Sequence, residues 1–113
     1  MAKVIITKRL DEEINKKFKK DSITIFKLIY SLKDNPKKGK PVGNVGSIVI
    51  KELKYESFRF YFITDGYRVK FLQIQELNDL LIRFVAMSDK KDQQKVIEEI
   101  KHVLRNLGSE GFS

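Results

Sequence analysis

One stretch, residues 34–46, separates a part of the chain that can be helical from a part that can form a sheet. Its sequence is DNPKKGKPVGNVG, and it holds both prolines and three of the six glycines of the 113-residue chain. Proline and glycine interrupt regular secondary structure, so this stretch is predicted to be a loop. The helix before it is expected to stop at Asn35, because a residue that precedes proline resists the helical conformation.

The residues before this loop predict a strand followed by two helices. Residues 4–6, Val-Ile-Ile, form a β-branched run that is typical of a strand. A helical stripe follows, with one apolar residue at every fourth position: Leu10, Ile14 and Phe18. Asp21 and Ser22 are both competent helix caps and mark a break. Residues 23–30 fit a strand by their β-branched content, but their apolar residues follow helical spacing, which favours a second helix.

The residues after the loop predict a run of strands. Residues 47–54 and 58–63 are rich in β-branched and aromatic side chains. Residues 64–66, Thr-Asp-Gly, are expected to form a tight hairpin turn, because Asp-Gly accepts the positive φ angles of such turns. Residues 67–74 alternate with period two, which predicts another strand. Residues 75–79 are then a connection, and residues 80–87 are apolar enough for a strand buried on both faces.

A last helix is predicted after Ser88 and Asp89, which can cap it. Its apolar stripe consists of Val96, Ile100, Val103, Leu104 and Leu107, and Gly108 stands where a helix commonly ends. The chain is therefore expected to form one α+β domain over residues 1–107. Two N-terminal helices and a C-terminal helix would pack on a mostly antiparallel sheet of four to five strands. Residues 108–113 are expected to form a disordered tail.

The charge of the chain is unevenly distributed. The net charge is +8, but residues 1–46 contain 12 Lys or Arg against 5 Asp or Glu, whereas residues 47–113 contain 11 against 10. Clustered positive charge attracts polyanions, and a pI near 9.7 is typical of a nucleic-acid-binding domain. An acidic protein partner or an ordinary solvated surface would account for the same charge.

Composition excludes several classes of site. The chain has no cysteine and one histidine, His102, so disulfides, thiolate zinc sites and multi-histidine metal sites within one chain are excluded. No metal and no cofactor are expected. The apolar runs are far shorter than the roughly 20 residues of a membrane helix, and the N-terminus lacks the apolar region of a secretion signal. A cytoplasmic protein is therefore expected.

Three short motifs resemble the RelE/ParE toxin superfamily. They are LKDNPKKG at residues 32–39, IKELK at residues 50–54 and FRFY at residues 58–61, in the same order of helices and strands as in that family. The resemblance implies a helical hairpin packed on a small antiparallel sheet. RelE-type members cleave mRNA at the ribosome without metal, by attack of the ribose 2′-hydroxyl on the adjacent phosphate. ParE-type members poison DNA gyrase, and both types pair with an antitoxin.

The resemblance also assigns candidate site residues. The catalytic set that it implies is Lys51, Lys54, Arg59 and Lys91. The implied RNA- and phosphate-binding residues are Lys37, Lys38, Lys40 and Lys90. Two positions depart from the family pattern, because Phe58 replaces a usual tyrosine and Ile97 stands about where RNA-cleaving members often have another. Isoleucine neither stacks well on a base nor donates a hydrogen bond, which weakens the case for cleavage.

Each candidate also has a structural interpretation. Taken singly, Lys51 and Lys54 fit solvated lysines that pair with Glu52 or Glu56 better than they fit catalytic residues. Arg59 and Arg83 interrupt apolar strands and need partners if they are buried, and the candidate partners are Asp65, Glu76 and Asp79. His102 is predicted to be an exposed helix residue. The aromatic residues Phe58, Phe60, Tyr61, Phe62, Tyr67 and Phe71 are interpreted as sheet core rather than as a base-stacking platform.

The sequence thus supports two functional hypotheses. The first is a RelE-like toxin that cleaves mRNA at the ribosome and is held by an acidic or amphipathic antitoxin. The second is a non-catalytic protein of the same fold, either a gyrase-directed toxin or a regulatory nucleic-acid-binding module. Convergence of Lys51, Lys54, Arg59 and Lys91 in one concave patch would favour the first, because metal-free cleavage needs several cations and a proton acceptor around one phosphate.

Overall fold

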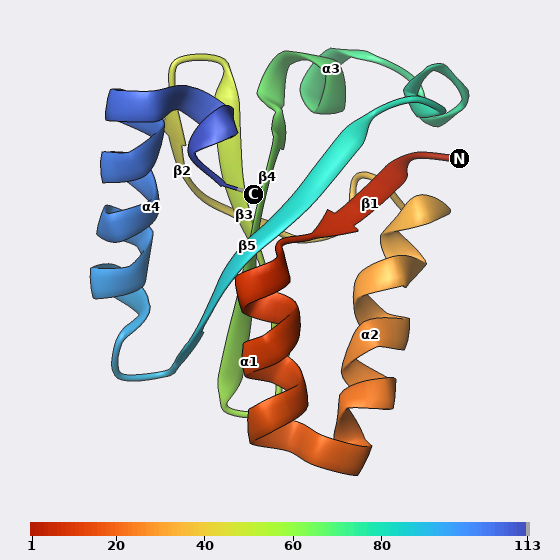
Figure 1. The fold of residues 1–113 in the computed structure, drawn as a ribbon. Helices are drawn as coiled ribbons and strands as arrows, with labels where there is room; N and C mark the ends of the chain where they lie inside the picture. The colour runs from red at the N-terminus through yellow and green to blue at the C-terminus, as the bar shows by residue number, and fades with distance from the viewer. Residues whose placement is uncertain (113) are drawn as a thin grey trace.

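A five-stranded sheet with helices on both faces forms the body of the protein (Figure 1). The structure is a computed structural model and describes residues 1–112. The strands are β1 (Lys3–Ile6), β2 (Lys40–Val45), β3 (Ile48–Tyr55), β4 (Phe58–Asp65) and β5 (Leu81–Asp89). The α-helices are α1 (Lys8–Phe18), α2 (Ser22–Tyr30), α3 (Gly66–Phe71) and α4 (Gln93–Leu107).

The sheet is mixed, with the strand order β1-β5-β4-β3-β2. β1 runs parallel to β5, and the other three pairings are antiparallel. The predicted α+β class and the mostly antiparallel sheet are confirmed. The two N-terminal helices and the C-terminal helix are also present, but the helix arrangement differs from the prediction because α3 is an additional helix.

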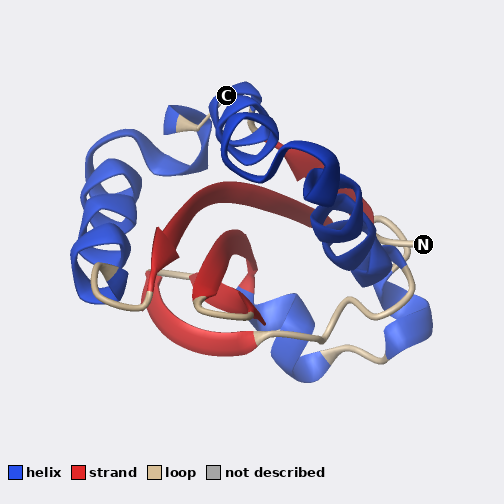
Figure 2. Ribbon diagram, turned by 90° about the horizontal axis from the view of Figure 1, so that it is seen from below, coloured by secondary structure: helices blue, strands red, loops and turns tan. Residues whose placement is uncertain are grey.

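The sheet separates two apolar cores, one under each layer of helices (Figure 2). Successive side chains of a strand point to opposite faces. Phe60 and Phe62 of β4 therefore enter the first core, with α1 and α2, while Tyr61 and Ile63 enter the second core, beneath α4. Because β4 is covered on both faces, it carries an almost continuous apolar run.

Helix ends follow local capping chemistry. The Thr7 hydroxyl accepts a hydrogen bond from the Leu10 amide at 3.3 Å and so begins α1. Lys19 has a φ of 51° and ends that helix, and Gly108, with a φ of 68°, ends α4 as predicted. The turn at Lys19–Asp21 lets α2 run back beside α1, so both helices cover the same face of the sheet (Figure 2).

The predicted strand over residues 67–74 is wrong. Residues 66–71 form the helix α3, followed by a 3₁₀ turn at Ile74–Leu77. The reason is a helix cap, because the Asp65 carboxylate accepts the Arg68 amide at 3.1 Å and draws the chain out of the sheet. Val69 and Leu72, three residues apart, then pack against the first core. The Asp-Gly pair begins a helix here instead of closing a hairpin.

The loop predicted over residues 34–46 is also partly wrong, because residues 40–45 form the edge strand β2. An edge strand needs hydrogen bonds on one side only, so it tolerates Pro41. The register of β2 against β3 shifts between Pro41 and Gly43, which absorbs the irregular sequence. The irregular part of the loop is therefore shorter than predicted.

The C-terminal segment differs from the predicted disordered tail. Residues 108–111 form a 3₁₀ turn, and Phe112 packs against the second core. The Arg83 guanidinium donates hydrogen bonds to the carbonyl oxygens of Ser109 at 2.8 Å and Phe112 at 3.1 Å. Arg83 thus finds its partners on the backbone, and none of the carboxylates named from the sequence pairs with it. Ser113 lies outside the described residues.

Candidate functional site

The four residues predicted to be catalytic do not share one face of the sheet. Lys51 lies opposite Phe62 and points into the first core, whereas Lys54 lies opposite Arg59 on the α4 side. Lys51 and Lys54 are three positions apart on one strand, and such residues point to opposite faces. The spacing of these two lysines in the sequence already places them on opposite faces of a strand, although the family resemblance groups them in one site. The patch formed by all four residues is therefore not assembled.

Lys51 is a buried structural lysine. Its residue is 3% exposed, and its Nζ donates a hydrogen bond to the Lys37 carbonyl oxygen at 2.8 Å. The same ammonium lies 5.9 Å from the centre of the Phe62 ring. Burial lowers the pKa of Lys51 below its ordinary 10.5, and the neighbouring charge of Lys37 lowers this pKa further. Lys51 thus fastens the loop over residues 34–39 to the sheet.

A pH-dependent contribution to stability is expected from Lys51. Its pKa is lower in the folded chain than in the unfolded chain, so the unfolded chain binds more protons between the folded value and 10.5. The free energy of unfolding should therefore rise with pH through this window, and Lys51→Met should flatten that rise. Urea unfolding at a series of alkaline pH values measures it. The exposed neighbour Lys54→Met is the control, and equal slopes in both variants would contradict the assignment.

Arg59 is buried and holds the turn between β3 and β4. Its guanidinium donates to the carbonyl oxygens of Phe58 at 3.1 Å and Glu56 at 3.4 Å, and its Nε lies 4.0 Å from the Glu52 carboxylate. Glu56 has a φ of 54°, so the turn is tight. The partners suggested for Arg59, Asp65, Glu76 and Asp79, are wrong; its ionic partner is Glu52. Arg59 is occupied by these bonds and has little surface for a phosphate.

Glu52, Arg59, Tyr61 and Ser88 form a polar cluster on the α4 side of the sheet. The Tyr61 and Ser88 hydroxyls share a hydrogen bond of 2.8 Å. Burial raises the pKa of Tyr61, against the opposing effect of the Ser88 bond. The Glu52 Oε2 atom is buried and has no hydrogen-bond partner within residues 1–112. A buried carboxylate oxygen without a hydrogen-bond partner lowers the stability of the fold. Glu52 Oε2 is therefore an atom whose position calls for a functional explanation.

Exposed lysines gather at the end of the sheet where this cluster lies. Ser88, Arg59 and Lys54 form one row of neighbours across β5, β4 and β3. We use the term basic end for the exposed lysines of this region, which belong to α1, β3 and the loop before α4: Lys16, Lys17, Lys54, Lys90 and Lys91. The end of α1, the β3–β4 turn and the β5–α4 loop all lie on this side of the molecule (Figure 1).

A groove of about 550 Å³ lies within the basic end. Phe58, Met87 and Ser88 line it together with Lys16 and Lys17. The Lys17 Nζ lies 5.0 Å from the centre of the Phe58 ring. Three carboxylates, those of Glu13, Asp89 and Asp92, also line the groove. The Asp89 carboxylate accepts the amides of residues 91 and 92, and Glu13 pairs with Arg9. The lining is therefore mixed in charge, and a phosphate fits only at its lysine side, beside the Phe58 ring.

None of the four predicted phosphate-binding lysines lines this groove, and only Lys90 lies at the basic end. Lys37 and Lys38 are exposed in the loop before β2. Lys40 lies opposite Glu52 in the sheet and shares the α4 side with Lys54. Ile97 is 6% exposed and belongs to the second core. His102 is exposed on α4, as predicted.

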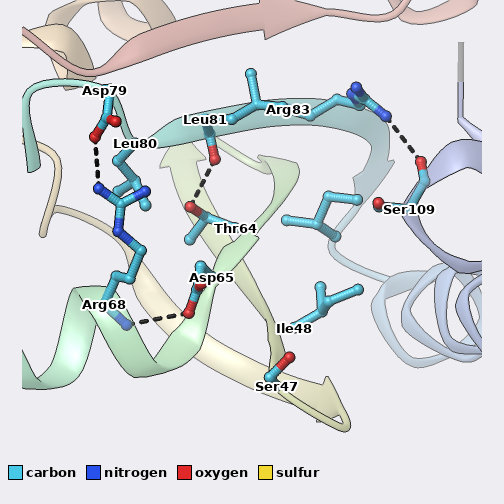
Figure 3. Close-up of a pocket in the computed structure, with 11 residues that line it drawn as sticks. Ser47, Ile48, Thr64, Asp65, Arg68, Asp79, Leu80, Leu81, Arg83 and Ser109 are labelled. Atoms are coloured by element: carbon cyan, nitrogen blue, oxygen red, sulfur yellow. Dashed lines mark hydrogen bonds and ion pairs between the residues drawn. The ribbon is translucent and has the colours of Figure 1, made fainter.

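A second concave site lies at the opposite end of the sheet (Figure 3). It encloses about 260 Å³ between β4, β5 and α3. Its polar groups are already engaged: Arg68 binds Asp79, the Thr64 hydroxyl donates to the Leu81 carbonyl at 2.7 Å, and Arg83 binds Ser109. The bond from Arg68 lowers the pKa of Asp79. None of the site residues predicted from the sequence lines it, and its bonds serve to join loops.

The aromatic residues divide between core and surface. Phe60, Tyr61 and Phe62 are fully buried, which confirms the interpretation as sheet core for these three. Tyr67 and Phe71 are exposed on α3, so that interpretation is wrong for them. The signal that could have placed them was their spacing of four, which is the spacing of one helix face.

Residues 1–112 contain no group of three or more His, Cys, Asp or Glu side chains able to hold a metal ion. In the same residues, no helix has both the length and the apolar character needed to cross a membrane. No protein-family model matches the chain, and neither a curated protein nor a solved structure matches it.

Proposed function

We propose that this chain is a RelE/ParE-type toxin that binds RNA at its basic end and thereby inhibits translation. The observation that carries the proposal is the position of exposed lysines from three separate segments, α1, β3 and the β5–α4 loop, at the same end of the sheet (Figure 1). Lysine is a compact cation that suits phosphate contacts more than the reading of bases. Binding through phosphates is independent of the RNA sequence and needs no residues that recognise bases.

Binding without cleavage agrees best with the positions of the predicted catalytic residues. Lys51 is committed to the Lys37 carbonyl, and Arg59 is committed to the β3–β4 turn and Glu52. Lys54 and Lys91 are the two members of that set that remain exposed. Two exposed cations can hold a phosphate, but cleavage also needs a proton acceptor and a proton donor at the reacting oxygens.

Cleavage of mRNA is the second candidate, and the unpaired Glu52 Oε2 favours it. In that mechanism the 2′-oxygen would form a bond to the adjacent phosphorus, and the bond from phosphorus to the 5′-oxygen would break. The Glu52 carboxylate would accept the proton of the 2′-hydroxyl, the Lys54 ammonium would donate a proton to the leaving 5′-oxygen, and Arg59 would stabilise charge on the phosphate. This reaction requires the β3–β4 turn to open, because Oε2 is buried. Both candidates imply a cytoplasmic protein and an acidic or amphipathic antitoxin, whose charge would complement the basic end.

We expect removal of four lysines of the basic end to weaken RNA binding strongly. The variant is Lys16→Ala/Lys17→Ala/Lys54→Ala/Lys91→Ala. Its slope of log affinity against log salt concentration should be smaller in magnitude by about 0.7 for each phosphate that it no longer neutralises. Fluorescence anisotropy with a labelled single-stranded RNA at several salt concentrations measures this. A matched variant, Lys3→Ala/Lys8→Ala/Lys27→Ala/Lys95→Ala, removes the same charge from other exposed positions and should retain most of the slope.

Translation in a cell-free system then separates the two candidates. Wild-type protein should inhibit translation while the mRNA stays intact, and the basic-end variant should not inhibit it. If the wild type instead cleaves the mRNA and Glu52→Gln, a nearly isosteric change, leaves it intact, then cleavage and not binding is the activity. Equal RNA affinity of the basic-end variant and the matched variant would refute both candidates at this site.

A further inference from the structure

The outward side of α3 carries large apolar side chains that no part of residues 1–112 covers. Tyr67 is 63% exposed and Phe71 is 59% exposed. Their ring centres are 4.8 Å apart and the ring planes meet at 45°. Adjacent exposed aromatic rings are uncommon on a protein surface and mark places where a ligand or partner binds. Both rings belong to α3, the additional helix of this fold.

The position of these rings is determined by the packing of α3. Val69 and Leu72 hold the inner side of the helix against the first core. The Gly66 amide donates a hydrogen bond to the Ser47 carbonyl at 2.8 Å. A Cβ atom at Gly66 would lie 3.0 Å from that carbonyl oxygen and 3.2 Å from the Val49 Cβ, so any other residue would push the helix and its neighbours apart by a few tenths of an ångström. The rings therefore stand on a supported element.

A groove of about 600 Å³ lies between α3 and the β2–β3 hairpin. Tyr67, Lys70 and Phe71 form one wall, and the other wall is formed by residues of the hairpin: Pro41, Val42, Gly43, Asn44, Gly46, Ser47 and Val49. Among the described residues that line this groove, Lys70 is the only one with a charged side chain. Its Nζ lies 5.3 Å from the centre of the Phe71 ring.

We propose that this groove binds single-stranded nucleic acid, with a base stacked on Tyr67 or Phe71 and a phosphate held by Lys70. Exposed aromatic faces beside a cation form the usual platform for unpaired bases, because every base has a face that stacks and every linkage carries a negative charge. A double helix offers no exposed base faces. An acidic or amphipathic peptide is the competing occupant, but the glycines, Asn44 and Ser47 interrupt the apolar wall that an amphipathic helix would need.

This inference goes beyond the proposed function, since the groove and the basic end lie at opposite ends of the sheet. Gly66 follows the last residue of β4, whereas Phe58, which lines the basic-end groove, is its first. A strand of that length spans about 24 Å. One RNA strand of several nucleotides is long enough to reach both grooves, and either groove can function if the other does not.

The test is fluorescence anisotropy of labelled oligo(A) with the full chain. Tyr67→Ala/Phe71→Ala should weaken binding at least about fivefold, because one stacked base contributes that much or more. Tyr67→Phe/Phe71→Tyr should bind like the wild type, since both rings remain. Lys70→Ala should lower the slope of log affinity against log salt by about 0.7, and the double alanine variant should leave that slope unchanged. Ile23→Ala removes an equally exposed apolar side chain from α2 and is the matched control.

The outcomes are distinguishable. Weaker binding by the double alanine variant, but not by Ile23→Ala, supports the proposal, and comparison of oligo(A) with oligo(dA) then identifies which nucleic acid is preferred. Unchanged oligo(A) affinity in the double alanine variant overturns the proposal, and this is the result expected if the groove binds a protein. If the double alanine variant loses as much affinity for duplex RNA as for oligo(A), the proposal is also overturned, because a duplex offers no exposed base faces.

The proposed function and this inference can fail separately. If the basic-end variant binds RNA normally while Tyr67→Ala/Phe71→Ala does not, the proposed function fails and this inference stands. Far-UV circular dichroism establishes that each variant is folded.

Discussion

Gly39→Ala is expected to destabilise the fold by about 3 kcal/mol, because it combines backbone strain with a steric clash. Gly39 has a φ of 106°, a conformation that alanine rarely adopts. A Cβ atom there would lie 2.7 Å from Cζ of Phe62 and 3.2 Å from the Glu52 carbonyl oxygen. Phe62 is fully buried, so its ring has no free space into which to move. The loop would be displaced, and the hydrogen bond from Lys51 to the Lys37 carbonyl would break.

Gly46→Ala is the matched control for this clash. Gly46 also has a positive φ, 57°, but a Cβ atom there meets nothing within 4 Å. Its substitution should cost only the backbone strain, about 1 kcal/mol. Urea unfolding of both variants measures the difference, which combines the close contacts with Phe62 and the Glu52 carbonyl with the less accessible φ of Gly39. Equal destabilisation of the two variants would show that the Phe62 ring moves aside and that the approach of the loop to the sheet is not limiting.

Arg59→Ala is expected to cost about 3 kcal/mol of stability, because it leaves a buried charge without its partner. The Glu52 side chain is 11% exposed, and its Oε2 already lacks a hydrogen bond within residues 1–112. The substitution also removes the donors to the Phe58 and Glu56 carbonyls, which hold the β3–β4 turn. Thermal and urea unfolding measure the destabilisation directly.

A double substitution separates the structural role of Arg59 from a catalytic one. Glu52→Leu/Arg59→Met replaces both charges by apolar side chains of similar size, and it should cost less than Arg59→Ala alone because no unpaired charge remains. A stability of Arg59→Ala equal to that of the wild type would contradict the assignment. Loss of toxicity in Arg59→Ala would then report on chemistry instead of folding.

The elements that could be predicted from the sequence are those in which one local pattern decides the structure. The stripe of Leu10, Ile14 and Phe18 predicted α1, and the apolar runs predicted β1, β3, β4 and β5. These patterns suffice where a segment carries one of them alone. Residues 23–30 carried both a β-branched run and helical spacing, and they form the helix α2 that the spacing favoured. Residues 67–74 carried two patterns, an alternation and a spacing of four, and the Asp65 cap decided between them.

The α+β class, the order of the main elements and the concentration of lysine in the first part of the chain follow from local sequence patterns. The role of each polar residue follows from tertiary packing, because it depends on the face of a strand and on neighbours distant in sequence. Lys51 and Lys54 differ by strand parity, so one is buried beneath the loop and the other is exposed at the basic end. Arg59 is occupied by Glu52 and a turn, and Tyr67 and Phe71 are exposed because Val69 and Leu72 take the inner side of α3.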